Sequence, residues 1–290
     1  LFNAVSTTAK AVAANYPFCT IDPNVGVVEV PDVRLTKISE YVKPKKLVAT
    51  TFEFVDIAGL VKGASKGEGL GNQFLGHIKD CDAIAHVVRC FDDADVVHVS
   101  GNVDPVRDIE VIDTELMLAD LVTVERRIDR NAKSAKSGDK TAVALAGFLD
   151  KIKKSLDNGV PLRRLEATPE EWLQVHDLHL ITQKPMLFVG NINEASAGSG
   201  TEDANPYYVK LREYATKMGA EVIPICAKVE AEVAELPPED RPTFLQDLGI
   251  KTSGLDKLIT AAYRMLGLRT YFTAGEQEVR AWTIHNGWKG

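Results

Sequence analysis

The sequence has little cysteine and no long apolar run. Cys19, Cys81, Cys90 and Cys226 are the four cysteines in 290 residues, and no two of them form a Cys-x-x-Cys pair. Few and irregularly spaced cysteines in a chain of this length are typical of reduced thiols in a cytosolic protein. Because neither a signal peptide nor an apolar segment of spanning length occurs, we expect a cytoplasmic protein with no membrane partner.

Positive charge is scarce as well, since the formal net charge is −7 at pH 7. This argues against a general coat of nucleic acid, although a local basic patch remains possible. Lys43-Pro44-Lys45-Lys46 is one candidate, and the same residues also fit a solvated turn. The chain opens at Leu1 without Met and stops at Gly290, so we expect both ends to be cut from a longer protein.

A glycine-rich stretch from residue 55 to residue 75 is the most distinctive part of the chain. The segment before it, Thr51–Val55, is rich in aromatic and β-branched residues and predicts a strand that ends at Asp56. A carboxylate at that position can hold a hydrated Mg²⁺, and the backbone amide of Gly59 lets a phosphate oxygen approach closely. Asp-x-x-Gly alone also fits an ordinary strand-to-turn junction. The neighbouring motifs therefore have to distinguish a phosphate site from a plain turn.

Strands and helices alternate through much of the chain, which predicts a mostly parallel α/β sheet covered on both faces. The last two predicted strands, residues 270–275 and 278–284, indicate the start of a further β-rich module. The expected strands of the main sheet are residues 25–30, 51–55, 83–91, 185–191 and 220–226, and the expected helices are residues 71–80, 206–218 and 254–266.

Between Asp104 and Gln183 the strand signal disappears. Apolar residues recur at helical intervals up to Ile128, and a second helical run covers Lys140 to Leu156. Two charged amphipathic helices joined by a short turn predict an antiparallel helical hairpin. The pattern fits either a protruding arm or a packed pair of helices.

Polar residues follow two of the predicted strands at their carboxyl ends. Asn191-Ile192-Asn193-Glu194 comes after one strand, and Cys226-Ala227-Lys228 comes after the next. An Asn amide can donate and accept at once, Ile can pack on a base, and Glu can accept from an amino group. Each tetrapeptide alone also fits an ordinary polar loop, but their order after successive strands favours a base-binding corner.

These motifs together resemble the YchF-type Obg-like ATPases of the translation-factor-related P-loop GTPase class. The resemblance covers essentially all 290 residues. It implies a P-loop nucleotide-binding domain, an inserted α-helical coiled-coil arm and a carboxy-terminal TGS domain. The segments that carry it are Asn15–Ile21, the glycine-rich loop Asp56–Asn72, Asn191–Glu194 and Thr270–Gly275.

The resemblance also assigns roles to individual residues. Thr20 would ligate Mg²⁺, Asp56 would hold the ion through water, and Gly59 would sense the γ-phosphate. The base would lie against Asn191, Ile192 and Glu194, with Ala227 and Lys228 opposite.

A different residue has to position the attacking water. Ordinary GTPases have a Gln for this after the loop glycine, whereas this chain has Leu60. The resemblance gives the role to His98, while His77 and His86 are expected to be structural.

Two departures from the family pattern affect the interpretation. The phosphate loop Gly-x-x-x-x-Gly-Lys-Ser/Thr should precede Leu1 and does not occur in the chain, so we expect these residues alone to be inactive. Only the first strands of the TGS domain are expected. The predicted domains are a nucleotide-binding domain in two parts, a helical coiled-coil insertion and the beginning of TGS: residues 1–103 and 184–267, 104–183, and 268–290.

The function expected from the resemblance is an ATP-binding and ATP-hydrolysing switch that requires Mg²⁺. Its expected partners are ATP and the ribosome, through the large subunit or ribosomal RNA, and the chain is expected to be a monomer. One alternative is a GTPase of the same class. The other is a ribosome- or RNA-binding module in which the nucleotide only stabilises a conformation.

Overall fold

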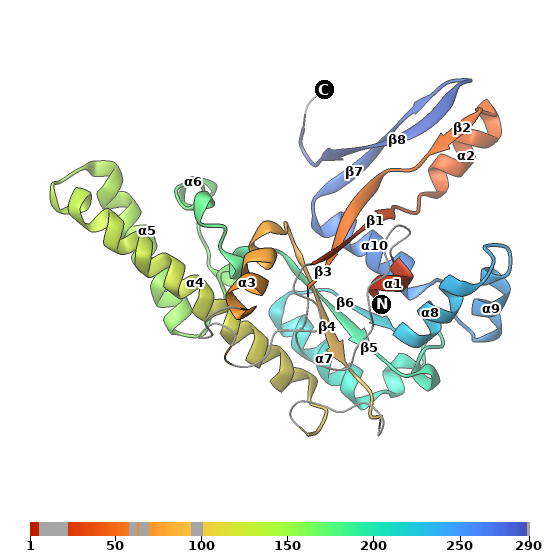
Figure 1. Ribbon diagram of the computed structural model, residues 1–290, viewed down its shortest axis with the longest axis horizontal. Coiled ribbons are helices and arrows are strands. Elements are labelled where there is room, and N and C mark those ends of the chain that lie inside the picture. Colours follow the sequence, from red (N-terminus) through yellow and green to blue (C-terminus); the bar gives the residue numbers. More distant parts are fainter. Residues whose placement is uncertain (6–22, 58–62, 64–69, 94–100, 289–290) are drawn as a thin grey trace.

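The computed structural model describes residues 1–5, 23–57, 63, 70–93 and 101–288. Figure 1 shows a central group of strands with helices around it, a helical hairpin on one side and a β-hairpin on the other. The strands are β1 Asn24–Glu29, β2 Lys46–Val48, β3 Thr51–Asp56, β4 Ile84–Arg89, β5 Met186–Asn191, β6 Val222–Ile225, β7 Leu268–Ala274 and β8 Glu278–His285. The helices are α1 Phe2–Val5, α2 Val33–Val42, α3 Leu70–Asp80, α4 Pro105–Lys136, α5 Lys140–Asp157, α6 Pro169–Leu173, α7 Pro206–Met218, α8 Ala227–Glu235, α9 Arg241–Asp247 and α10 Gly254–Met265.

The central strands form a parallel sheet in the order β4-β5-β6, which confirms the predicted α/β class. Alternate residues of β5 enter different cores, because successive side chains of a strand point to opposite faces. Met186 and Phe188 pack in a cluster with residues of α3, α4 and α7. Leu187 and Val189 pack instead with residues of β6 and α10. Residues 186–189 of the middle strand are therefore all apolar, as a sheet covered on both faces requires.

The two long helices α4 and α5 form the antiparallel hairpin that helical periodicity predicts. Val124 of α4 packs with Phe148, Leu149 and Ile152 of α5 in a core of their own. Near the turn, Asn131 Nδ2 donates to the Ala142 carbonyl at 2.7 Å. Figure 1 shows this hairpin extending away from the sheet as a projecting arm, while Ile109 and Leu116 in the first half of α4 pack in the main core.

The remaining strands form two further ladders. β1 pairs antiparallel with β3 in a separate ladder, although both strands were expected in the main sheet. β7 and β8 form an antiparallel hairpin, and β2 joins it by pairing parallel with β8. α2 and β2 have no counterpart among the elements expected from the sequence. A segment between β1 and β3 thus belongs to the sheet of the carboxy-terminal hairpin.

Within the described ranges, no helix has both the length and the apolar character needed to cross a membrane.

Candidate functional site

Asn191 joins the carboxyl ends of three neighbouring strands. It is the last residue of β5, and its register partners are Arg89 in β4 and Ile225 in β6. The Asn191 carbonyl accepts a hydrogen bond from the Cys90 amide at 2.8 Å. The Asn191 side-chain oxygen accepts from the backbone amide of Ala227, the first residue of α8, at 3.1 Å. The two polar turns predicted from sequence are therefore joined directly.

Glu194 and Lys228 form a second link between the same two turns. The Lys228 ammonium lies 3.0 Å from Glu194 Oε1, and both side chains are more than half exposed. The hydrogen bond to Glu194, together with its negative charge, raises the pKa of Lys228. The corner thus presents a carboxylate acceptor and an ammonium donor beside the Asn191 amide.

Ile192 lies differently from the other residues of this corner. Its backbone amide donates to the Ile225 carbonyl at 2.9 Å. Its side chain is only 3% exposed and packs in the core with Phe188 of β5 and Tyr208 of α7. The predicted contact between the Ile192 side chain and a base stays a prediction. The side chain exposes almost no apolar surface that could support such a contact.

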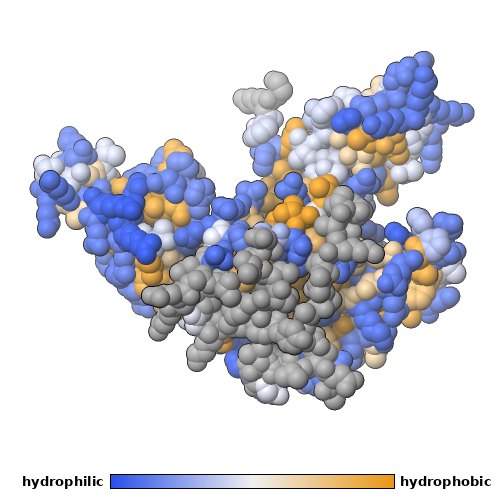
Figure 2. Space-filling model, in the orientation of Figure 1, coloured by the Kyte–Doolittle hydropathy of each residue, from blue (hydrophilic) through white to orange (hydrophobic). Residues whose placement is uncertain are grey.

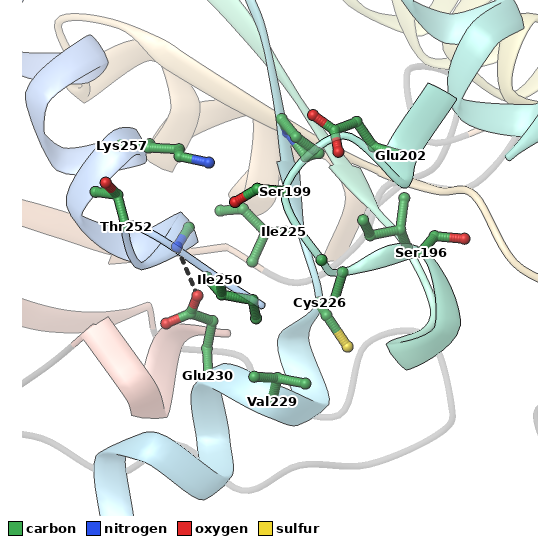
Figure 3. A pocket seen from close by; sticks show the side chains of 15 residues that line it. Ser196, Ser199, Glu202, Ile225, Cys226, Val229, Glu230, Ile250, Thr252 and Lys257 are labelled. Atoms are coloured by element: carbon green, nitrogen blue, oxygen red, sulfur yellow. Dashed lines mark hydrogen bonds between the residues drawn. The ribbon is translucent and has the colours of Figure 1, made fainter. Parts of the chain in front are cut away.

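Behind this corner lies a small cavity of about 20 Å³, lined by residues of α8, α10 and the loop before α7. Its volume suits a single water molecule and not a nucleotide. Figure 3 shows Glu230 of α8 on its wall, with a hydrogen bond from the Gly254 amide. Glu230 is 3% exposed, and burial raises its pKa. Its two oxygens lie 2.6 Å from the Gly254 nitrogen and 2.7 Å from the Ser253 hydroxyl, so Glu230 fastens α8 to the start of α10.

Asp56 lies at the carboxyl end of β3, as predicted, and its carboxyl group is half-buried. Burial raises its pKa. A carboxylate in this position is chemically suited to hold a hydrated Mg²⁺. Across the described parts of the chain, no group of three or more His, Cys, Asp or Glu residues could hold a metal ion. The other predicted residues Thr20, Gly59 and His98 lie outside the described residues.

Gly63 is the one described residue between positions 58 and 69 of the glycine-rich loop, and it contacts the arm. The Gly63 amide donates to Glu115 Oε1 of α4 at 2.7 Å. Glu115 is 5% exposed whereas Gly63 is exposed, so this hydrogen bond is partly buried. Gly63 has φ +90°, a conformation that side-chain-bearing residues rarely adopt. The base of the arm is therefore attached to the loop that is predicted to sense the γ-phosphate.

Comparison with known proteins identifies the family. A family model described as 50S ribosome-binding GTPase matches residues 1–126. The ribosome-binding ATPase YchF of Bacillus subtilis is 57% identical over 289 residues, which cover 100% of this chain and 78% of the relative. The chain belongs to the YchF family. YchF of Escherichia coli O157:H7 is 54% identical over 98% of this chain and 77% of its own length.

A solved structure supports the same assignment. The YchF GTPase of Schizosaccharomyces pombe is similar to this chain with a TM-score of 0.83 and 35% sequence identity. The match covers 100% of this chain and 78% of that one. The YchF family, a family of P-loop nucleotide hydrolases, was thus correctly recognised from the sequence motifs.

The sequence did not indicate two of the residues that shape the YchF site. Glu230 has no motif around it, and its partners Ser253 and Gly254 lie more than 20 positions away. Glu115 lies 52 positions from Gly63. A buried carboxylate is hard to find from a sequence when its partners lie far along the chain, as Gly63 and Gly254 do here.

Proposed function

We propose that this chain forms the nucleotide-binding core of an ATP-hydrolysing switch that acts on ribosomes. The observation that carries this proposal is the corner in which Asn191 holds the Ala227 amide and Glu194 pairs with Lys228. Bacillus subtilis and Escherichia coli relatives with this family's fold are named ribosome-binding ATPases. These names support both the reaction and the partner.

The corner can bind a purine base, and the preference for adenine rests on the relatives that are named ATPases. The Asn191 oxygen is already engaged by the Ala227 amide, which leaves the Asn191 amino group to donate to a ring nitrogen. Glu194 carries only acceptor atoms and can accept from the exocyclic amino group of adenine or of guanine. A GTPase remains the second candidate, because the S. pombe relative is titled a GTPase. An RNA-binding module with a purely structural nucleotide is the third.

The remaining roles belong to the same proposal. Thr20 and Asp56 would hold Mg²⁺, and Gly59 would sense the γ-phosphate. We further propose that these 290 residues do not hydrolyse ATP by themselves, because they contain no Gly-x-x-x-x-Gly-Lys-Ser/Thr motif. We also propose that the protein is cytoplasmic and monomeric and that it contacts the large ribosomal subunit. Its arm would be a coiled-coil insertion at residues 104–183, and residues 268–290 would begin a TGS domain.

Calorimetry with ATP and GTP tests the base choice in a form of the protein that carries a phosphate loop. We expect ATP to bind about tenfold more tightly than GTP, equivalent to about 1.4 kcal/mol. The double variant Ile192→Lys, Glu194→Asp should shift the preference toward GTP, whereas Glu213→Asp on an exposed face of α7 should not. Equal affinities for the two nucleotides would remove the basis for an ATPase. In the same experiment, the chain as printed should bind neither nucleotide.

Hydrolysis measured with and without ribosomes separates the switch from a module that only binds. Stimulation of ATP turnover by ribosomes is the expected result. Ribosome binding that is unaffected by nucleotide, with no turnover, would favour the RNA-binding module instead.

A further inference from the structure

The tip of the α4–α5 arm carries a concentrated positive charge. Residues 126–140 contain six Lys and Arg residues and two Asp residues, in a chain whose net charge is −7. Of the six basic residues, Arg127 is held by Asp177 at 2.9 Å. The other five are exposed, and none of them forms an ion pair with another described residue: Arg126, Arg130, Lys133, Lys136 and Lys140.

Three of these basic residues form a stripe on one face of α4. Arg126, Arg130 and Lys133 are spaced four and three positions apart, which places them on the same side of a helix. Four residues advance an α-helix by about 6 Å, so the stripe extends over two turns of the arm. Lys136 and Lys140 continue the positive charge around the turn.

The tip holds these charges on a rigid support. Asn131 Nδ2 donates to the Ala142 carbonyl across the turn at 2.7 Å. Asp139 caps α5 by accepting from the Ala142 amide at 2.8 Å, so one of the two acidic side chains is engaged with the helix end. A surface that is already ordered loses less conformational entropy on binding.

Residues 126–140 expose no large apolar side chain, and the neighbouring Val143 of α5 is a single exposed one. Ile128 is the one large apolar residue between positions 126 and 140, and it packs in the core of the arm. Protein interfaces are usually centred on buried aromatic or aliphatic side chains. Figure 2 shows mainly hydrophilic surface at the outer end of the arm. Exposed Lys and Arg without an apolar centre fit a phosphate backbone instead.

We propose that the tip of the arm, residues 126–140, binds the phosphate backbone of RNA. This inference rests on the proposed ribosome-associated function. It identifies the tip of the arm as the surface that contacts RNA. The contact is electrostatic and does not read the base sequence, because every residue in the stripe is a cation that reaches phosphate oxygens. The tip lies at the far end of the arm whose base contacts Gly63 through Glu115.

Charge-neutralising variants with a matched control test the proposal. The tip variant Arg126→Ala, Arg130→Ala, Lys133→Ala removes three positive charges from exposed helix positions. The control Lys151→Ala, Lys153→Ala, Lys154→Ala removes three from α5 of the same arm, where each lysine already faces a carboxylate within 4 Å. Both sets place Ala, a strong helix former, in helices. Circular dichroism then verifies that both variants keep the helix content of the parent.

The measurement is binding of labelled large-subunit ribosomal RNA, and of intact ribosomes, to the purified chain over a range of salt concentrations. The tip variant should bind about tenfold more weakly, and the slope of log affinity against log salt should fall by about 2 to 3. The control should match the parent. Polyglutamate should compete poorly with the RNA.

Each other outcome overturns a specific statement. Equal weakening by the tip and control variants, or no effect of the tip variant, would show that the tip does not hold the RNA. Competition by polyglutamate as strong as that by RNA would assign the tip to an acidic protein. A parent chain that binds neither RNA nor ribosomes would refute the ribosome-associated function itself, and with it the tip proposal. That result would not contradict the proposal of ATP hydrolysis, which is measured separately in a form that carries a phosphate loop.

Discussion

His86 shows how burial changes the chemistry of a single side chain. It lies on β4 with its ring 5.8 Å from that of Phe188, and its Nδ1 is buried without a hydrogen-bond partner in the described residues. Burial lowers its pKa to about 4; Arg163 contributes to the lowering, while Asp113 and Asp108 oppose it. His86 is therefore neutral in the folded protein, as expected for a histidine with a structural role.

A depressed histidine pKa makes stability fall in acid. Between pH 6.5 and 4 the unfolded chain binds a proton at His86 that the folded chain does not, so the free energy of unfolding decreases as pH falls. The loss should reach about 3 kcal/mol. We expect His86→Gln to reduce this slope in urea unfolding measured at several pH values, and the exposed His176→Gln to leave it unchanged. An unchanged slope in His86→Gln would assign the acid sensitivity to other groups.

His98 has a different proposed role, which depends on the family pattern and on Leu60. A neutral imidazole can accept a hydrogen bond from the attacking water, which Leu60 cannot do. In a form that carries a phosphate loop, His98→Ala should lower ATP turnover about a hundredfold while ATP affinity changes little. His77→Ala and His86→Ala should alter stability instead. Turnover at the parent rate in His98→Ala would mean that another group positions the water.

At the level of elements, Glu230 fixes the orientation of α8 against α10. Glu230→Ala would leave the Gly254 amide and the Ser253 hydroxyl buried without their acceptor, which should cost about 2 to 3 kcal/mol of stability. Glu230→Gln keeps one acceptor and should cost less. Glu232→Ala on the exposed side of the same helix is the control. If urea unfolding gives the same midpoint for Glu230→Ala and Glu232→Ala, the two helices are held together by their apolar contacts alone.

Across the whole molecule, the sequence predicted elements whose signals are local. The apolar run of β5 and the helical intervals of α4 and α5 depend on nearby residues. The closeness of the Asn191 and Lys228 turns could also be predicted, because the carboxyl ends of parallel strands meet at one sheet edge.

Features that depend on distant partners could not be predicted. β2 has only three residues, and its pairing with β8 spans more than 200 positions, so the segment around Lys46 was interpreted as a basic turn. The burial of Ile192 depends on how α7 packs on β5. The contact between Glu115 and Gly63 depends on the position of the arm. Pattern and spacing carry no information about such contacts.

The place of β2 in the chain restricts how the carboxy-terminal hairpin can move. The backbone passes from β1 to β2, returns from β2 to β3 through Ala49 and Thr50, and crosses again from α10 to β7. A body attached through one flexible connector can rotate about it, but three short connectors leave only small rotations. Tyr263 of α10 adds hydrogen bonds to the Arg269 carbonyl and to Thr283 of β8. A displacement of this hairpin would therefore pull on β3 and reach Asp56 as mechanical tension along the strand.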